Sequence, residues 1–248
     1  MKRRTFIKHT TTAALCTGLL PTFSFTGLKP KFTRNQLMGK GNPDIVGKTY
    51  TGKMHKAAAT AFATLKEAAK EDGITIEVVS AYRSFQRQKE IYESKYRRFT
   101  SQGLPPEKAI KKIITYSTIP GTSRHHWGTD IDIIDGGVAP RPENVLRPGL
   151  FHGEGPFCKL KTWLDKNAET FGFFEVYTNN ANRKGFKYEP WHYSYAPVSK
   201  PMLKAYKKLD IKEILTGEKI KGAAHFTEEF IEMYRTEHIL GINPNLLS

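Results

Sequence analysis

Apolar residues recur at every third or fourth position between Met54 and Ala69, which is the spacing of one buried helix face. Gly73 follows this stretch, and a glycine in that place is typical of a left-handed helix end. Apolar and polar residues then alternate from 74 to 79, as they do in a strand with one buried face. We therefore expect a helix that leads directly into a strand.

The same two patterns run through the middle of the chain. Helical spacing returns through Gln88 and Tyr92, after Pro105-Pro106, and around Trp163. Alternation typical of strands returns at 128–134, 173–177 and 191–195. This order predicts an α+β fold, with a small, mainly antiparallel sheet and helices packed on one side.

From about residue 199 the pattern is helical to the end of the sequence. Pro201 is expected in the first turn of one helix, and Thr227, which two glutamates follow, is expected at the start of another. His225 and His238 are isolated histidines on these segments, and we expect both to be structural. The stretch predicts a helical extension that covers the core or contacts a partner.

Two of the expected strands carry chemistry-bearing side chains. The 128–134 alternation puts Asp130 and Asp132 on one face, and the 191–195 alternation puts His192 and Ser194 on one face, opposite Trp191, Tyr193 and Tyr195. His125 lies just before the first of these strands, in a turn-rich segment. Two side chains from strands and one from a loop can therefore come together on the surface of a rigid sheet.

Two imidazoles and one carboxylate form a donor set that suits zinc, which keeps a fourth position for water when three side chains bind it. Glu189 lies three residues before His192 and adds a carboxylate that can move a proton of this water. This combination indicates metal-assisted hydrolysis. The residues alone leave two choices open, because His126 rivals His125 and Asp130 rivals Asp132.

Three ordered segments match a known family pattern: Ser80-Ala-Tyr-Arg83-Ser-Phe-Gln-Arg-Gln88, Ser123-Arg-His125-His-Trp-Gly128-Thr-Asp-Ile-Asp132 and Glu189-Pro-Trp-His192. The chain resembles the zinc D-alanyl-D-alanine carboxypeptidases of bacterial cell walls, relatives of the vancomycin-resistance D,D-carboxypeptidases and dipeptidases. The resemblance covers about residues 36 to 197 and implies a Hedgehog/D,D-peptidase fold. It implies zinc ligands at His125, Asp132 and His192 and a general base at Glu189.

The resemblance also implies roles for three residues around the metal. Arg83 would stabilise the substrate carbonyl oxygen as it becomes an oxyanion, while Gln88 and Ser123 would bind substrate. From the residue types alone, Arg83 could instead form a surface ion pair and Ser123 could cap a turn or a helix. The family usually has a small residue two positions before the ligand aspartate, where this chain has Asp130. Asp130 would accept a hydrogen bond from a ligand imidazole or alter the metal preference.

The first residues resemble a twin-arginine export motif, Lys2-Arg3-Arg4-Thr5-Phe6-Ile7-Lys8, and no charged residue follows it until Lys29. This uncharged stretch is rich in threonine and broken by Gly18 and Pro21, so we expect a removed signal and no stable membrane span. The expected organisation is a signal segment at 1–27, an N-terminal arm at 28–53, a zinc peptidase domain at 54–197 and the helical extension at 198–248. The expected location is the periplasm or cell envelope, reached through the twin-arginine export machinery.

The formal net charge of +15 indicates attraction to polyanions, of which nucleic acid is the usual one. The basic residues are spread along helices with no stripe of interleaved aromatic residues, so we expect no nucleic-acid binding. The expected function is a D,D-carboxypeptidase that acts on peptidoglycan stem peptides. The alternatives are an endopeptidase or a D,D-dipeptidase on the same scaffold, and a non-catalytic zinc-containing recognition module like the Hedgehog domain, which the base Glu189 disfavours.

Overall fold

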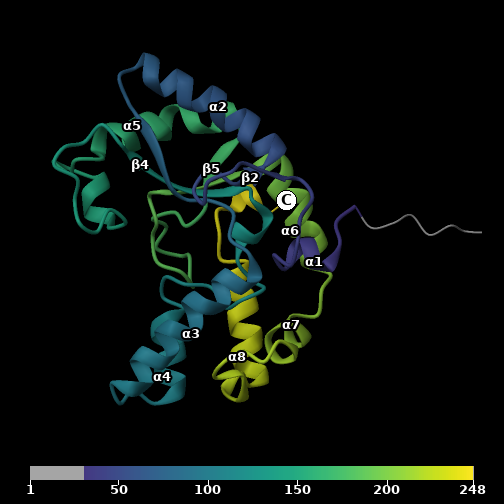
Figure 1. Ribbon diagram of the computed structural model, residues 1–248. Helices are drawn as coiled ribbons and strands as arrows, with labels where there is room; N and C mark the ends of the chain where they lie inside the picture. Colours follow the sequence, from purple (N-terminus) through teal and green to yellow (C-terminus); the bar gives the residue numbers. More distant parts are fainter. Residues whose placement is uncertain (1–30, 248) are drawn as a thin grey trace, which may run out of the picture. The chain divides into compact units, whose positions relative to one another are not determined.

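Four antiparallel strands form the central sheet of the structure, a computed structural model that describes residues 31–247 (Figure 1). Their order is β3 (Ile76–Ser80), β4 (Asp130–Asp135), β6 (His192–Tyr195) and β5 (Phe173–Glu175). A separate two-stranded sheet pairs β1 (Ile45–Val46) with β2 (Met54–His55). The predicted α+β fold with a small antiparallel sheet is confirmed.

One face of the central sheet is apolar and lies against α2 (Lys56–Glu71) and α5 (Cys158–Asn167), which run together over the strands in Figure 1. Alternation along β4 and β6 sends Ile131, Ile133 and Tyr193 into this core. Burial of each such large side chain contributes about 1.5–3 kcal/mol to folding. The intervening polar residues of the same strands therefore face the other way.

Helix α2 begins at Lys56 because the preceding Met54 and His55 pair with β1, and the His55 side chain caps the helix by accepting a hydrogen bond from the Ala57 amide. The helix ends before Gly73, whose φ of +69° gives the predicted left-handed end. The predicted helix-to-strand passage is confirmed, with both elements starting about two residues later than the pattern alone indicated.

Helix α3 (Phe85–Ser101) follows β3 after a short turn, and Ser84 caps it by accepting a hydrogen bond from the Arg87 amide. Arg83 therefore lies at the junction of strand and helix. Gln88 and Lys95 are seven residues apart on α3, so they lie on the same side of it. Helix α4 (Pro106–Ile113) begins at Pro106, as predicted.

The C-terminal part contains α6 (Ala196–Tyr206), α7 (Ile211–Gly217), α8 (Glu228–Met233) and the π-helix η5 (Tyr234–Ile239). Thr227 caps α8 by accepting from the Phe230 amide, as predicted. The prediction for Pro201 was wrong, because α6 starts five residues earlier and Pro201 lies inside it. The helix tolerates the missing backbone donor because its Met202, Leu203 and Tyr206 side chains are buried.

The remaining elements are short. They are α1 (Arg34–Leu37) and the 3₁₀ segments η1 (Arg124–Trp127), η2 (Pro148–Phe151), η3 (Ala168–Phe171), η4 (Ala223–His225) and η6 (Pro244–Leu246). The predicted strand at 173–177 ends earlier, at Glu175, and the one predicted at 191–195 begins at His192. Trp191 consequently packs with Phe151 and Phe157, apart from Tyr193.

The largest hydrophobic core joins the C-terminal helices to α1, α3 and α4. It contains Tyr92 and Ile110 of α3 and α4 together with Tyr206, Ile214 and Tyr234 of the extension. Residues from Phe32 onward form one compact unit. The predicted signal segment at 1–27 and the start of the arm at 28–53 lie outside the described residues. Among residues 31–247, the helices lack the length and hydropathy of a membrane span.

Candidate metal centre

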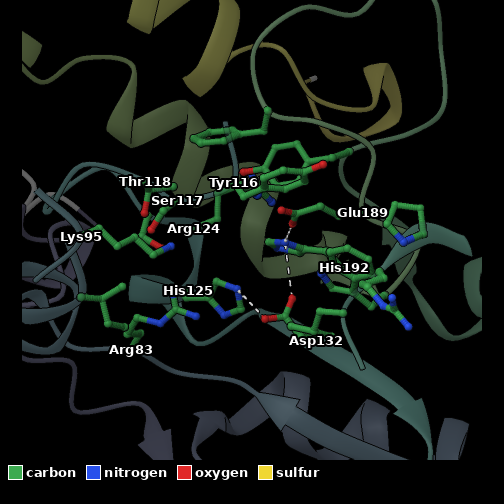
Figure 2. A pocket seen from close by; sticks show the side chains of 18 of the residues that line it. Arg83, Lys95, Tyr116, Ser117, Thr118, Arg124, His125, Asp132, Glu189 and His192 are labelled. Atoms are coloured by element: carbon green, nitrogen blue, oxygen red, sulfur yellow. Dashed lines mark hydrogen bonds and ion pairs between the residues drawn. The ribbon is translucent and has the colours of Figure 1, made fainter. Parts of the chain in front are cut away.

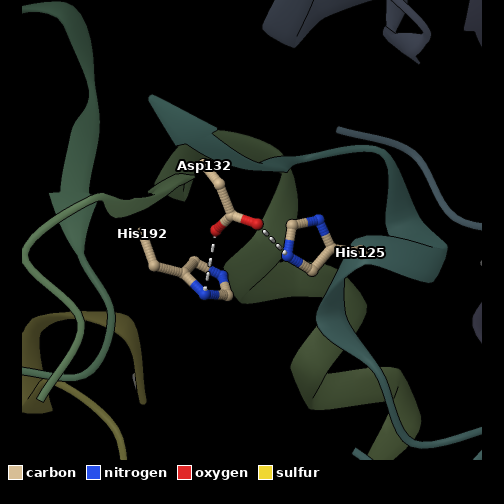
Figure 3. Close-up of side chains that lie close together, drawn as sticks. All are labelled: His125, Asp132 and His192. Atoms are coloured by element: carbon tan, nitrogen blue, oxygen red, sulfur yellow. Dashed lines mark ion pairs between the residues drawn. The ribbon is translucent and has the colours of Figure 1, made fainter. Parts of the chain in front are cut away.

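Three buried side chains, His125, Asp132 and His192, offer ligand atoms that lie within 4.8 Å of one another (Figure 3). His125 Nε2 lies 3.5 Å from Asp132 Oδ2, and His192 Nδ1 lies 3.6 Å from Asp132 Oδ1. Tetrahedral ligands at about 2.0–2.2 Å from a zinc ion are themselves roughly 3.3–3.6 Å apart. Asp132 Oδ1 is buried without a hydrogen-bond partner among the described residues. The spacing and the unsatisfied oxygen fit a bound cation.

Strand register brings two of these ligands together. Asp132 of β4 lies directly opposite His192 of β6 in the antiparallel pair. His125 is in η1, which ends at Gly128 with a φ of +70°, and β4 starts two residues later. A Cβ at Gly128 would lie 2.7 Å from the His55 backbone nitrogen, so both the turn and the close packing require glycine here.

A backbone carbonyl orients the His125 ring. Nδ1 lies 2.8 Å from the Ala81 carbonyl oxygen and donates to it, which leaves Nε2 as the free ligand atom. Burial, together with the nearby charges of Arg83 and His192, holds the pKa of His125 well below its usual value. The ring is therefore neutral, as a metal ligand must be.

His192 lies between carboxylates. Its Nε2 is 3.0 Å from Asp130 Oδ2, and its Nδ1 faces both Asp132 and Glu189, whose Oε2 is 2.9 Å away. Burial opposes the charged form of the ring, but the hydrogen bonds with Asp130 and Glu189 outweigh it and raise the pKa of His192 to about 10. The acidic side chains around His192 therefore favour positive charge at this position.

Burial raises the pKa of Asp132 to about 6, against the lowering effect of the His192 charge. A cation bound at this carboxylate would lower its pKa again and keep the carboxylate ionised.

The buried side chain of Asp130 is fully engaged by its neighbours. Arg124 Nε donates to Oδ2 at 2.9 Å, and Ser194 Oγ and Thr129 Oγ1 donate to Oδ1 at 2.5 and 2.9 Å. Burial alone would raise the pKa of Asp130, but Arg124 and His192 outweigh it and hold the pKa far below its usual value. Asp130 thus supports His192 from behind, while Asp132 faces the shared ligand position.

His126 is held by backbone groups. Its Nδ1 donates to the Arg83 carbonyl oxygen at 2.6 Å, and its Nε2 accepts from the Gly121 amide at 3.1 Å. Both ring nitrogens are therefore satisfied, and the ring is fully buried. Of the two neighbouring histidines, geometry places His125 at the candidate metal position.

A cavity of about 430 Å³ opens over these ligands (Figure 2). Its lining includes Glu189, Arg83, Lys95 and Ser123, in addition to His125, Asp132 and His192. Ser123 Oγ is buried and has no hydrogen-bond partner in the described part of the chain. The cavity therefore joins the candidate metal position to polar groups that remain available to a bound molecule.

Residues 51–198 match the family model of VanY, D-alanyl-D-alanine carboxypeptidase. The chain belongs to this family. A D-alanyl-D-alanine carboxypeptidase of Enterococcus faecalis is 30% identical over 156 residues, which are 62% of this chain and 53% of that protein. The chain thus spans about half the length of this relative. Membership of the VanY family confirms the predicted metallopeptidase class.

Two solved structures are similar to this VanY-family chain. One is a mutant of the vancomycin-resistance D,D-pentapeptidase VanY in complex with Zn(II), with 26% identity, a TM-score of 0.50, and coverage of 67% of this chain and 85% of that one. The other is VanYB in complex with D-alanine-D-alanine, with 26% identity, a TM-score of 0.51, and coverage of 73% and 92%.

Arg83 of this VanY-family chain is held by neutral groups. Nη1 donates to Gln88 Oε1 at 2.8 Å and Nη2 donates to Ser80 Oγ at 2.9 Å. Gln88 Nε2 in turn donates to the Thr118 carbonyl oxygen at 2.6 Å, and the Gln88 side chain is fully buried. These contacts favour a role for Gln88 in orienting Arg83, while direct substrate binding by Gln88 stays a prediction.

Sequence patterns did not point to several cavity residues. Lys95 does not belong to any of the three motifs. Its spacing of seven residues from Gln88 on a helix could have indicated that both side chains lie on the same helix face. Tyr177 packs edge-on against the His192 ring at 5.0 Å between centroids, and Phe186 adds a further apolar wall. These residues converge through tertiary packing from separate parts of the chain.

Proposed function

We propose that this VanY-family chain is a zinc-dependent D,D-carboxypeptidase that removes the terminal D-alanine of peptidoglycan stem peptides. The observation that carries the proposal is the buried His125, Asp132 and His192 group, with Glu189 beside it, at the floor of a cavity. The similar VanY D,D-pentapeptidase holds Zn(II), and the similar VanYB binds D-alanine-D-alanine. Both support zinc and a D-alanyl substrate here.

The proposed zinc ligands are His125 Nε2, Asp132 and His192 Nδ1, each held by its own contacts. When bound, zinc polarises the carbonyl group and lowers the pKa of a water ligand from about 15.7 to roughly 7. The carbonyl of Ala81 and the carboxylate of Asp130 orient the two imidazoles from behind.

Glu189 is the proposed general base. Its Oε2 receives a hydrogen bond from His192 Nδ1 at 2.9 Å, but a ring nitrogen that binds a cation has no hydrogen to donate. With a cation on His192 Nδ1, this carboxylate would be free to act as a base. Glu189 then takes the proton of the attacking water and returns it to the departing amine nitrogen.

Arg83 is the proposed electrostatic stabiliser. Its side chain lines the cavity, and Ser80 and Gln88 hold its guanidinium in one orientation. A fixed guanidinium stabilises the negative charge that develops on the carbonyl oxygen without reorganising during the reaction. Ser123 Oγ faces the same cavity and is free to bind the substrate, within the described residues.

The decisive experiment is hydrolysis of a stem pentapeptide that ends in D-Ala-D-Ala, by the protein before chelation, after chelation and after zinc is added back. We expect release of one D-alanine, its loss with chelator and its recovery with zinc. Mass spectrometry of the products distinguishes the alternatives. Release of a D-Ala-D-Ala dipeptide, or a cut inside the stem or cross-bridge, would replace the carboxypeptidase proposal by a dipeptidase or endopeptidase.

Two further results would change the proposal. Release of D-alanine from a tetrapeptide but not from the pentapeptide would mean that the bond next to an L-centre is cut. Absence of cleavage of any stem peptide by fully zinc-loaded protein would favour a non-catalytic recognition module.

We also propose export by the twin-arginine route to the cell envelope, where peptidoglycan lies. The motif around Arg3 and Arg4 supports this location. Replacement of both arginines by lysine should leave the protein in the cytoplasmic fraction. The control substitution Lys8→Arg should leave export unchanged. Envelope delivery of the double variant at the wild-type level would refute the export route.

A further inference from the structure

Two cations that line the cavity, Arg83 and Lys95, form no ion pair or hydrogen bond with an acidic side chain in the described part of the chain. The hydrogen bonds of Arg83 go to the neutral Gln88 and Ser80. Lys95 forms no hydrogen bond or ion pair with any residue in 31–247. Partly buried cations are costly unless an anion pairs with them, so the cavity is built to receive negative charge.

The other arginines near the site each bond to another group, and two of them, Arg87 and Arg147, are exposed. Arg124 pairs with the buried Asp130 at 2.9 Å. Arg87 is exposed and pairs with Glu90 at 3.2 Å. Arg147 is an exposed lining residue, and its Nε donates to the Asn144 carbonyl oxygen. Lys95 is therefore the cation best placed for a second anionic group inside the cavity.

Lys95 lies among hydroxyl groups. Ser117 and Thr118 line the same cavity, and Thr118 Oγ1 is buried without a hydrogen-bond partner in the part that the structure describes. Figure 2 shows Lys95 and Arg83 entering from one side, and Glu189 and His192 lying on the other. Burial and the like charges of Arg83 and Arg98 lower the pKa of Lys95 against the raising effect of the Glu189 charge, and a bound anion would add to that raising effect.

A carboxypeptidase substrate presents two oxygen groups that require positive charge. One is the carbonyl oxygen of the bond to be cut, and the other is the terminal carboxylate, which lies about one residue, or roughly 3.5 Å of chain, further on. Arg83 is fixed by Ser80 and Gln88 and cannot move between the two. A second cation on a flexible stem is suited to the second group.

We propose that Lys95 binds the terminal carboxylate of the peptide substrate, with the Thr118 hydroxyl as an additional donor, while Arg83 serves the carbonyl oxygen. This assignment rests on the proposed carboxypeptidase function. It makes Lys95 the residue that selects peptides with a free C-terminus over peptides that continue or are amidated.

The test compares Lys95→Met with wild type on a pentapeptide and on its C-terminal carboxamide. For the free acid we expect KM to rise about tenfold or more, because a charge-assisted hydrogen bond is lost, with kcat within about twofold. KM for the carboxamide should not change. Lys95→Arg should restore most of the preference for the acid, which excludes a merely structural effect of the substitution.

Arg97→Met is the matched control, because Arg97 is on the same helix, is exposed and pairs only with Glu93 within the described residues. It removes the same formal charge outside the cavity and should leave both KM values unchanged. An equal rise in KM for acid and carboxamide in Lys95→Met, or an unchanged KM for the acid, would overturn the assignment.

Binding without turnover separates this inference from the proposed function. Calorimetry with zinc-loaded Glu189→Gln should show that D-Ala-D-Ala binds about tenfold or more tightly than its carboxamide, and that adding Lys95→Met removes the difference. If the wild type cleaves no stem peptide but this preference exists and depends on Lys95, the proposed function fails and the Lys95 assignment stands. If cleavage occurs but the preference survives Lys95→Met, the proposed function stands and the Lys95 assignment fails.

Discussion

The metal ligands and the C-terminal helices, which hold the loop at 117–124 just before His125, are encoded in different ways. The ligands stand in two short sequence motifs, one with His125 on η1 and Asp132 on β4 and the other with His192 on β6. The C-terminal helices use scattered side chains: Tyr234 Oη accepts from the Ile119 amide at 2.9 Å, and Tyr206 Oη donates to the Gly121 carbonyl oxygen at 2.8 Å. The chemistry is thus concentrated in motifs, while part of its support lies beyond the family match at 51–198.

The same helices also support the cavity wall. Phe186 lines the cavity, and its ring packs edge-on against His238 at 4.9 Å between centroids. His238 in turn stacks on Tyr234. A segment without catalytic motifs therefore contributes to the shape of the site, and the two regions should respond differently to substitution.

The largest effect should come from Glu189→Gln, which keeps the size of the side chain and removes the base. We expect kcat to fall by about 10²–10⁴-fold, because this is the usual contribution of a positioned general base. Zinc content, measured by mass spectrometry, should equal that of wild type. Glu232→Gln, an exposed change on α8, is the control. Wild-type hydrolysis by Glu189→Gln at equal zinc content would remove Glu189 from the mechanism.

A smaller effect is expected for Asp130→Asn, which keeps the shape but removes the buried charge behind His192. Zinc affinity should fall about 10–100-fold, because the partners of ligand imidazoles tune the strength of binding. Competition with a chelator of known affinity measures this. Glu143→Gln makes the same charge change at an exposed position and should have no effect. Equal affinities in both variants would show that Asp130 only stabilises the fold.

Tyr234→Phe tests the contribution of the extension. The Ile119 amide would lose its acceptor in a buried place, so the free energy of unfolding should fall by about 1–3 kcal/mol. We expect kcat/KM to fall only severalfold, since no proposed reacting group is removed. Denaturant unfolding and stem-peptide kinetics measure the two effects, with the exposed Tyr50→Phe as control. A loss of activity as large as in Glu189→Gln would mean that the extension does more than support the loop.

The smallest expected effect concerns His238 and pH. Burial lowers the pKa of His238 to about 4, below the usual value of 6.5. Because the unfolded chain binds the proton more readily, stability should be lost as pH falls from about 6.5 toward 4. In His238→Phe the loss of stability between pH 7 and 5 should be smaller by on the order of 1 kcal/mol, or about 2–4 °C in Tm. An identical pH dependence in wild type and variant would contradict this.

Local pattern was sufficient for much of the fold. Helix α2, its left-handed end at Gly73, the start of α4 at Pro106 and the cap of α8 at Thr227 all follow from spacing and from single residues. Pro201 is the exception, because the buried face of α6 outweighs the loss of one backbone donor. The preference of proline for the first turn therefore predicted the wrong start of α6. The helix is stabilised by packing against distant residues, which local preference does not include.

The alternation in β4 and β6 already placed Asp132 and His192 on polar faces, because the period of two is a property of any extended chain. The family resemblance implied His125 and Asp132 as ligands, but the physical reason for His125 over His126 and for Asp132 over Asp130 is visible only in the folded chain. Each choice depends on a distant partner: the carbonyl groups of Ala81 and Arg83 receive the two histidines, and the strand register places Asp132 opposite His192. Lys95 entered the cavity for the same reason, since only the packing of α3 brings it there.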